Sequence, residues 1–318
     1  MSFVHEDSDF EGLLSIVADE ARIARALVEK DYWVMHAMWA LHQTGLEIWF
    51  KGGTSLSKGF RLIERFSEDL DLRIEPGAAA SVPLVRSWTS TNKGPIAERR
   101  AFFESLAAAM RIPNAEVALD IASIDRAARA ANYQVRYPGR FVADLGAAMR
   151  PFVQLEVGVA RVTPFVARPI HSFVHDWLER AGQLSAYDDN LPRAVRCVHP
   201  MVTLIEKLDA IARRYPREPM EPAAFVRHYE DAAAIIAKID ELPPLEMDVG
   251  ALIKEMIEER QIARHPIVED PAFTLADESR RQALTEAHRA IGVMYWGARR
   301  SLDDACELIR SWLARNPA

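Results

Sequence analysis

The segment LEIWFKGGTSLSKGFRLIERFSEDLDLRI, residues 46–74, contains the pattern that decides the fold. Its start, LEIWF, is rich in large apolar residues and indicates a β-strand, and the glycine pair that follows indicates a turn. The stretch SLSKGFRLIERF, residues 55–66, has helical character, and the alternating DLDLRI, residues 69–74, predicts a second strand. The segment therefore predicts the order strand, turn, helix, strand.

Helical and strand patterns continue on both sides of this segment. Apolar residues recur at helical spacing from about residue 9 to residue 42, and a helix is expected to begin near Pro95. YQVRY (133–137) and FVQLEVGVARV (152–162) predict strands. We therefore expect a mixed β-sheet core with N-terminal helices.

After about residue 173 the strand signals nearly vanish. Helices are predicted at 171–182, 200–215, 221–239, 249–262, 276–295 and 301–314. The predicted fold class is α+β. A nucleotidyltransferase-like core is expected over residues 1–170, followed by a mainly α-helical domain over residues 171–318 that completes the active-site cleft.

Composition narrows the class of protein. The chain has 318 residues, of which 49% are hydrophobic, and this length suits two domains of a soluble protein. No secretory signal and no run of about 18 apolar residues is present, so we expect a cytoplasmic protein with no membrane association. The net charge of −7 argues against indiscriminate nucleic-acid binding. Cys197 and Cys306 form no CxxC pair.

Asp69 and Asp71 are the first candidates for chemistry. Because one residue separates them on a predicted strand, their side chains share a face, while Leu70 and Leu72 face the core. Close carboxylates repel each other unless a cation compensates, and a hard, oxygen-preferring ion such as Mg²⁺, or alternatively Mn²⁺, fits best. Taken alone, the pair is weak evidence for a metal site, because a solvated strand edge or two caps would give the same pattern.

The preceding glycine turn adds a candidate anion site. Gly52 and Gly53 let the backbone approach a phosphate closely, and Thr54 and Ser55 can cap a helix whose N-terminal amides attract anions. Lys58 follows one helical turn after Thr54. An anion site beside a metal site is what nucleotide transfer requires, because amides hold the triphosphate while the metal bridges its oxygens.

Glu156 is a candidate third metal ligand. In the predicted strand, Val153, Leu155, Val157 and Val159 face one way and Glu156 faces the other. A carboxylate on a central strand is costly without a partner, which favours a metal. An exposed face of an edge strand is the alternative.

The run from Trp49 to Ile74 resembles the signature of the AbiEii/AbiGii toxin family of nucleotidyltransferases, which includes the MenT toxins of toxin–antitoxin systems. Three further segments resemble family elements: VEKDYWV (28–34), LIEKLDAIARR (204–214) and VRHYEDAAAI (226–235). The order and spacing of these segments match the family over most of the chain.

The resemblance implies a DNA-polymerase-β-like core in which Asp69 and Asp71 hold a metal. Lys207 and Asp231 would complete the active site from the helical domain. Members of the family transfer a nucleoside monophosphate from a nucleoside triphosphate, often CTP, to the 3′ end of tRNA or to protein side chains. A cognate antitoxin neutralises them. Glu230 stands where many members carry an aromatic residue, and this departure predicts different packing of its helix.

The residues of the helical half are also open to structural readings. Lys207 and Arg214 lie seven apart on one predicted helical face, where they could reach triphosphate oxygens or simply face solvent. Arg227 and Asp231 can bridge each other at i, i+4. Under the resemblance, Asp231 instead orients Lys207 or the attacking hydroxyl and Arg227 binds phosphate. His228 is interpreted as structural.

Four basic residues flank a Ser/Thr/Asn loop and form a candidate RNA path: Arg86, Lys93, Arg99 and Arg100. The leading interpretation is a toxin that transfers a nucleotide to RNA, with the tRNA acceptor end as acceptor. Two alternatives stay open. One is transfer to a protein or small molecule, including self-modification, and the other is a non-catalytic nucleotide-binding protein that acts through a partner.

Overall fold

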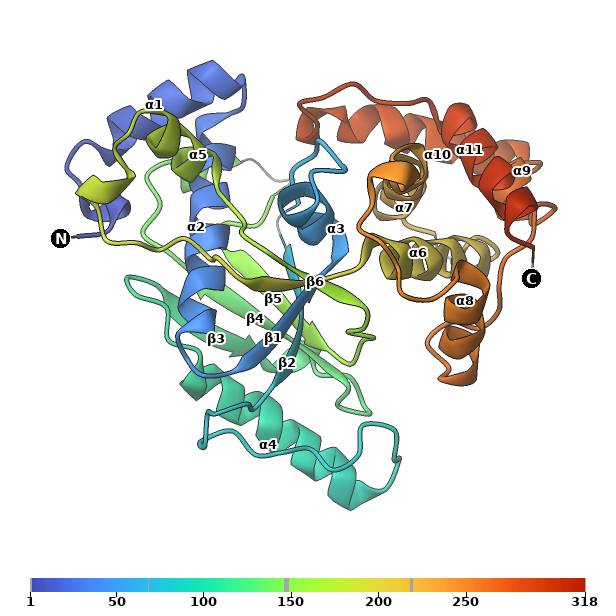
Figure 1. Cartoon of the computed structure of the whole chain (residues 1–318), viewed down its shortest axis with the longest axis horizontal. Helices are drawn as coiled ribbons and strands as arrows, with labels where there is room; N and C mark the ends of the chain where they lie inside the picture. Colours follow the sequence, from blue (N-terminus) through green and yellow to red (C-terminus); the bar gives the residue numbers. More distant parts are fainter. Residues whose placement is uncertain (1, 68, 146–148, 218–219, 318) are drawn as a thin grey trace. The chain divides into compact units, whose positions relative to one another are not determined.

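The computed structural model describes residues 2–67, 69–145, 149–217 and 220–317 (Figure 1). The chain forms two compact units. The first consists of Met1–Gly59 and Ser67–Cys197, and the second of Phe60–Phe66 and Val198–Ala318. The second unit is therefore built from two separate parts of the chain.

A seven-stranded sheet forms the centre of the first unit, as far as the described residues show, in the order β3-β4-β5-β2-β1-β7-β6. The strands are β1 (Glu47–Lys51), β2 (Asp69–Glu75), β3 (Glu116–Asp120), β4 (Ala130–Arg136), β5 (Val153–Gly158), β6 (Phe165–Arg168) and β7 (Val195–Val198). β1 is antiparallel to β2 and parallel to β7, and β2 is parallel to β5. The sheet is mixed, and the predicted α+β class is confirmed.

The helices of the first unit are α1 (Phe10–Ala21), α2 (Arg25–His42), the short α3 (Gly52–Thr54), α4 (Lys93–Ala109) and α5 (Phe173–Arg180). α1, α2 and α5 pack on one another, and α4 packs along β3 (Figure 1). A π-helical turn, Ser55–Gly59, continues α3. Short 3-10 turns occupy Val4–Glu6, Ile121–Ser123, Val142–Leu145 and Leu184–Ala186.

Three consecutive charged residues of α2 are buried and reach different parts of the first unit. Glu29 accepts hydrogen bonds from the backbone amides of residues 140–141, at 2.6 and 2.8 Å. The Lys30 ammonium donates to the carbonyl oxygen of Arg150 at 2.6 Å. Asp31 pairs with a third segment, described below. Successive side chains of a helix point about 100° apart, so one helical turn can hold three segments in place.

The second unit is helical. Its helices are α6 (Pro200–Arg214), α7 (Pro222–Ala237), α8 (Val249–Glu258), α9 (Pro271–Thr274), α10 (Glu278–Ala290) and α11 (Leu302–Arg315), with 3-10 turns at Ile239–Glu241 and Ile291–Met294. α7 packs against α6, α10 and α11. Proline at the first position starts α6, α7 and α9, where its missing N–H leaves no helical hydrogen bond unmade. No described helix is long and apolar enough to span a bilayer.

The helix expected over residues 55–66 is wrong beyond Gly59. Arg61 has a positive φ of 52°, which interrupts a right-handed helix. The following residues make backbone hydrogen bonds within the second unit instead. The Phe66 N–H donates to the carbonyl oxygen of Met294 at 2.8 Å, and the backbone carbonyl oxygen of Glu64 accepts the N–H of Trp296 at 3.1 Å. This strip of chain, Phe60–Phe66, is thus part of the helical unit.

The other sequence-based elements agree with the structure, with three strands added. β3, β6 and β7 were not predicted. The compact units divide after Cys197, whereas the sequence-based boundary lies after residue 170, because α5 and β7 pack within the first unit. The assignment of functional roles to the two domains stays a prediction.

Candidate active site

The glycine turn brings the backbone directly against one of the two aspartates. The chain turns at Gly52 as it leaves β1, with a φ of 74° that favours glycine. A Cβ placed on Gly52 would lie 1.7 Å from Oδ2 of Asp71. Gly52 is therefore required twice, once for the backbone conformation and once for the room that the Asp71 carboxylate occupies.

Thr54 and Ser55 do not cap a helix as expected. The helical turn already begins at Gly52, with Lys51 in the N-cap position and no side-chain cap. The buried Thr54 hydroxyl donates to the carbonyl oxygen of Asp69, 2.7 Å away, so it ties the turn to the start of β2. Ser55 is also buried, and Gly53 lies within the turn. Nucleotide binding by Gly52, Gly53, Thr54 and Ser55 stays a prediction. Because the two hydroxyl-bearing side chains are buried, the backbone amides of the turn would have to make the contacts.

Lys58 is held by a carboxylate from α2. Its ammonium lies 2.7 Å from Oδ1 of Asp31, and both side chains are largely buried. Oδ2 of Asp31 also accepts the backbone N–H of Phe173 at 2.8 Å, and the ammonium lies 3.9 Å from the centre of the Phe173 ring. Lys58 thus has a fixed position at the end of the turn.

Asp69, Asp71 and Glu156 share one face of the sheet. Exposure alternates along β2, with Leu70 and Leu72 buried as predicted. Asp71 lies in register with Glu156 on the parallel strand β5. β5 is flanked by β4 and β2, so the alternative that placed Glu156 on an edge strand is wrong.

A pocket of about 180 Å³ opens on this face. Its lining includes Lys51, Asp71, Asn132 and Glu156, which occupy adjacent positions on β1, β2, β4 and β5. Asp71 and Glu156 thus line one pocket, and Lys51 is the one cationic residue among the described residues of its lining.

The donor chemistry of this face suits a hard cation, because all three candidate ligands are carboxylates. The structure brings Asp71 and Glu156 to neighbouring strands but does not gather one oxygen of each of the three acids within 4.8 Å of the others. Asp69 instead accepts a hydrogen bond from the Arg150 guanidinium at 2.8 Å, where both side chains are partly exposed. An exposed pair of this kind is worth less than about 1 kcal/mol, so a metal could displace it.

In the second unit, Asp231 is the centre of a buried ion-pair group. The Arg65 guanidinium donates to both carboxylate oxygens, at 2.9 and 2.8 Å. The Lys207 ammonium lies 2.8 Å from Oδ2. Burial alone would raise the pKa of Asp231, but Arg65 and Lys207 outweigh it and hold that pKa below its usual range. The alternative in which Arg227 bridges Asp231 is therefore wrong, because Arg65 and Lys207 are the partners of this carboxylate.

Arg65 is the partner that sequence reasoning missed. It lies in the Phe60–Phe66 strip, 166 residues before Asp231 in the chain, and only 4% of it is exposed. Arg65 lies between Glu64 and Phe66 in a segment interpreted as a helix, and nothing in the sequence distinguishes it from Arg61, four residues earlier.

Glu230 explains the departure from the family pattern. Its carboxylate accepts hydrogen bonds from the Arg299 guanidinium, at 2.9 and 2.7 Å, and from the Tyr295 hydroxyl. A charged residue is therefore accommodated on α7 because the chain before α11 supplies partners. These side chains and Asp231 line a pocket of about 320 Å³ in the second unit.

Arg214 lines a separate pocket of about 280 Å³, together with Arg217, Phe225 and His228. Burial lowers the pKa of Arg214, and the neighbouring arginines 213 and 217 lower it further. Burial also lowers the pKa of His228 to about 3, with Lys207 adding to the effect. The His228 imidazole is therefore neutral at pH 7.

One family profile, described as the nucleotidyl transferase AbiEii toxin of a type IV toxin–antitoxin system, matches residues 33–307. The chain belongs to the AbiEii family of nucleotidyltransferase toxins. This match confirms the resemblance inferred from the sequence. A comparison with curated proteins gives no match.

The AbiEii match contains the glycine turn, both β2 aspartates, Glu156, Lys207 and Asp231. It extends over parts of both compact units of this AbiEii chain. It begins after Asp31, although the structure shows that Asp31 positions Lys58.

The basic loop expected to guide RNA is partly wrong for this AbiEii protein. Arg99 is fully buried and donates to the carbonyl oxygens of Ser87, Ser90 and Ala127, at 2.7, 2.9 and 2.9 Å. Arg86 pairs with Glu98. Arg99 therefore holds the loop together and is not available to a phosphate backbone.

Proposed function

We propose that this AbiEii toxin transfers a nucleoside monophosphate from a nucleoside triphosphate to RNA, with the 3′ end of tRNA as acceptor and CTP among the candidate donors. The observation that carries the proposal is the contact of the Gly52 turn with Asp71, which in turn lies in register with Glu156. A cognate antitoxin would restrain the activity.

The proposed catalytic roles in the first unit follow from donor chemistry. Asp69 and Asp71, with Glu156 beside them, would hold Mg²⁺ or Mn²⁺, which would neutralise charge on the triphosphate when bound. The backbone amides of Gly52 through Ser55 would bind phosphate oxygens. Lys58, fixed by Asp31, would place positive charge at the end of that turn.

In the second unit, we assign Lys207 to the reacting phosphate and Asp231 to its positioning. The ion pair at 2.8 Å limits the ammonium to few orientations. Arg65 donates two hydrogen bonds to Asp231 and so fixes the carboxylate that positions Lys207. Arg227 and Arg214 remain proposed phosphate ligands.

An RNA acceptor is supported by the arginines at the end of α6. Arg213, Arg214 and Arg217 lie close enough to depress the pKa of Arg214, and such clusters attract phosphates. Arg214 and Arg217 also line the adjoining pocket of about 280 Å³, where a phosphate could bind.

The test is a screen of each α-labelled nucleoside triphosphate with Mg²⁺ and total tRNA. We expect label in tRNA with at least one triphosphate. Label on polypeptide alone would select the self-modification alternative, and no label in any acceptor would overturn transfer.

Asp71→Asn and Lys207→Met should each lower transfer at least about 100-fold, because each removes charge needed at the phosphates. Glu75→Gln is the matched control, since Glu75 follows on the same face of β2 but pairs with Arg73. It should keep near-normal activity. Equal loss in all three variants would indicate damage to the sheet rather than to a site.

A further inference from the structure

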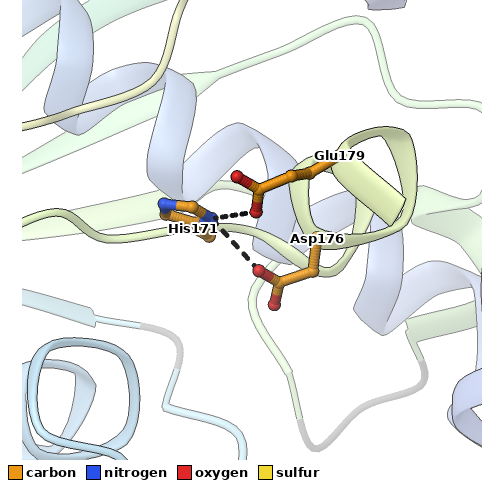
Figure 2. A group of neighbouring side chains, drawn as sticks. All are labelled: His171, Asp176 and Glu179. Atoms are coloured by element: carbon orange, nitrogen blue, oxygen red, sulfur yellow. Dashed lines mark hydrogen bonds and ion pairs between the residues drawn. The ribbon is translucent and has the colours of Figure 1, made fainter. Parts of the chain in front are cut away.

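A second group of metal-type ligands lies at the start of α5, apart from the acidic face of the sheet. His171, Asp176 and Glu179 point toward one another (Figure 2). Nδ1 of His171 lies 3.1 Å from Oδ1 of Asp176 and 3.8 Å from Oε2 of Glu179. In the part of the chain that the structure describes, no other three His, Cys, Asp or Glu side chains gather within 4.8 Å.

The local backbone explains this convergence. Ser172 caps α5, its hydroxyl accepting the N–H of His175 at 3.1 Å. His171 therefore sits just outside the first turn. Asp176 and Glu179 lie three residues apart, which places them on the same face of the helix. The cap fixes where His171 stands relative to both acids.

The ligand types select the class of ion. Mg²⁺ and Ca²⁺ prefer oxygen ligands alone, whereas an imidazole with two carboxylates suits Zn²⁺ and its neighbours. Ligands about 2.1 Å from a tetrahedral ion lie about 3.4 Å apart, close to the two separations observed. We propose that His171, Asp176 and Glu179 bind one Zn²⁺, with water as the fourth ligand.

An ion can reach these residues from solvent. The side chains of His171, Asp176 and Glu179 are 17%, 36% and 60% exposed. A bound ion would be exchangeable and removable by a chelator, unlike one in a closed structural site.

Metal binding at this site would also affect Lys58 at the end of the glycine turn. Phe173, between the ligands, donates its N–H to Asp31, and the Lys58 ammonium lies over its ring. A metal that fixes the start of α5 would therefore fix the pair that positions Lys58. Binding to the folded state alone would raise the melting temperature.

The test uses Co²⁺ as a spectroscopic substitute for Zn²⁺, titrated into the whole protein in excess Mg²⁺, which fills oxygen-only sites. We expect one equivalent of Co²⁺ with the visible absorption of a nitrogen-containing, low-coordinate site. Zn²⁺ should displace it, and the melting temperature should rise with Zn²⁺ alone.

His171→Ala should abolish the absorption and Glu179→Gln should weaken binding about ten-fold or more, each with an unchanged circular dichroism spectrum. Glu20→Gln is the matched control. Glu20 lies on α1 and accepts hydrogen bonds from Trp177 and Arg180 of α5, but it is not one of the three proposed metal ligands. Asp71→Asn should also keep the signal. Absence of the absorption in the unmodified protein, or its persistence in His171→Ala, would overturn the proposed metal site.

Discussion

Gly52 is the residue on which the candidate site depends most directly. Its conformation lies in the region that side chains avoid, and its α-carbon faces the Asp71 carboxylate. Both constraints act on the same atom, so no other residue satisfies them.

Gly52→Ala should lose transfer activity and destabilise the protein by about 1–2 kcal/mol from backbone strain, with a further cost from moving Asp71. Gly94→Ala is the control, because a Cβ at Gly94 meets nothing within 4 Å. Urea denaturation and the tRNA labelling assay would measure both effects. Normal transfer by Gly52→Ala would contradict the proposed contact between turn and carboxylate.

Spacing in the sequence was sufficient for some site residues and not for others. Two aspartates at i, i+2 must share a face of a strand, and β2 bears this out. The buried partner of Asp231 could not be found in this way. Arg65 is distant in sequence, and only the path of the folded chain brings its guanidinium to that carboxylate.

At the level of elements, α2 is stabilised by a polar group within its apolar packing. Asn190 donates to the Tyr32 hydroxyl at 2.9 Å and to Nδ1 of His36 at 3.0 Å, and it accepts from Nε2 of His175 at 2.8 Å. Burial lowers the pKa of both histidines to about 4. The network therefore needs neutral imidazoles.

The free energy of unfolding should fall as the pH drops from about 6.5 to about 4, because the unfolded chain binds protons that buried His36 and His175 do not. Each histidine could account for on the order of 3 kcal/mol. Urea titrations at pH values from 7 to 4.5 would measure this change in the free energy of unfolding. Most carboxyl groups titrate below that range. His36→Gln should reduce the slope, and an unchanged slope would contradict the assignment.

Strong periodicity predicted most helices and the central strands, whereas the missed strands carry weak patterns. β3 and β6 lie at the two ends of the sheet and are only partly buried, so alternation is faint. β7 has four residues, too few for a pattern amid helical neighbours. The spacing of apolar residues in Phe60–Phe66 suggested a helix. In the structure these residues instead belong to the second unit, and local spacing does not encode such tertiary packing.

At the level of the whole molecule, the second unit is incomplete without that strip. Residues 60–66 supply Arg65 to Asp231, and the backbone carbonyl oxygen of Arg61 accepts a hydrogen bond from the Lys238 ammonium at 3.1 Å. Removing one member of a buried ion pair costs about 3–5 kcal/mol.

A fragment of residues 198–318 should therefore melt at low temperature or without cooperativity. A synthetic peptide of residues 60–66 added in excess should raise its melting temperature, and the same peptide with Arg65→Ala should not. Calorimetry of the fragment with each peptide measures this. Equal stabilisation by both peptides would mean that apolar contacts, rather than the ion pair, bind the strip.

Because the second unit is built from two separate parts of the chain, its structure also bears on the exchange of gene segments between related genes. A gene segment that encodes residues 198–318 carries Asp231 but not Arg65, so its exchange between related genes keeps this ion pair only where the recipient also encodes an arginine at position 65. A substitution at Arg65 or at Asp231 would leave the other charge buried without this partner, although 166 residues separate the two. This dependence favours exchange of the whole coding region over exchange of the segment for residues 198–318 alone.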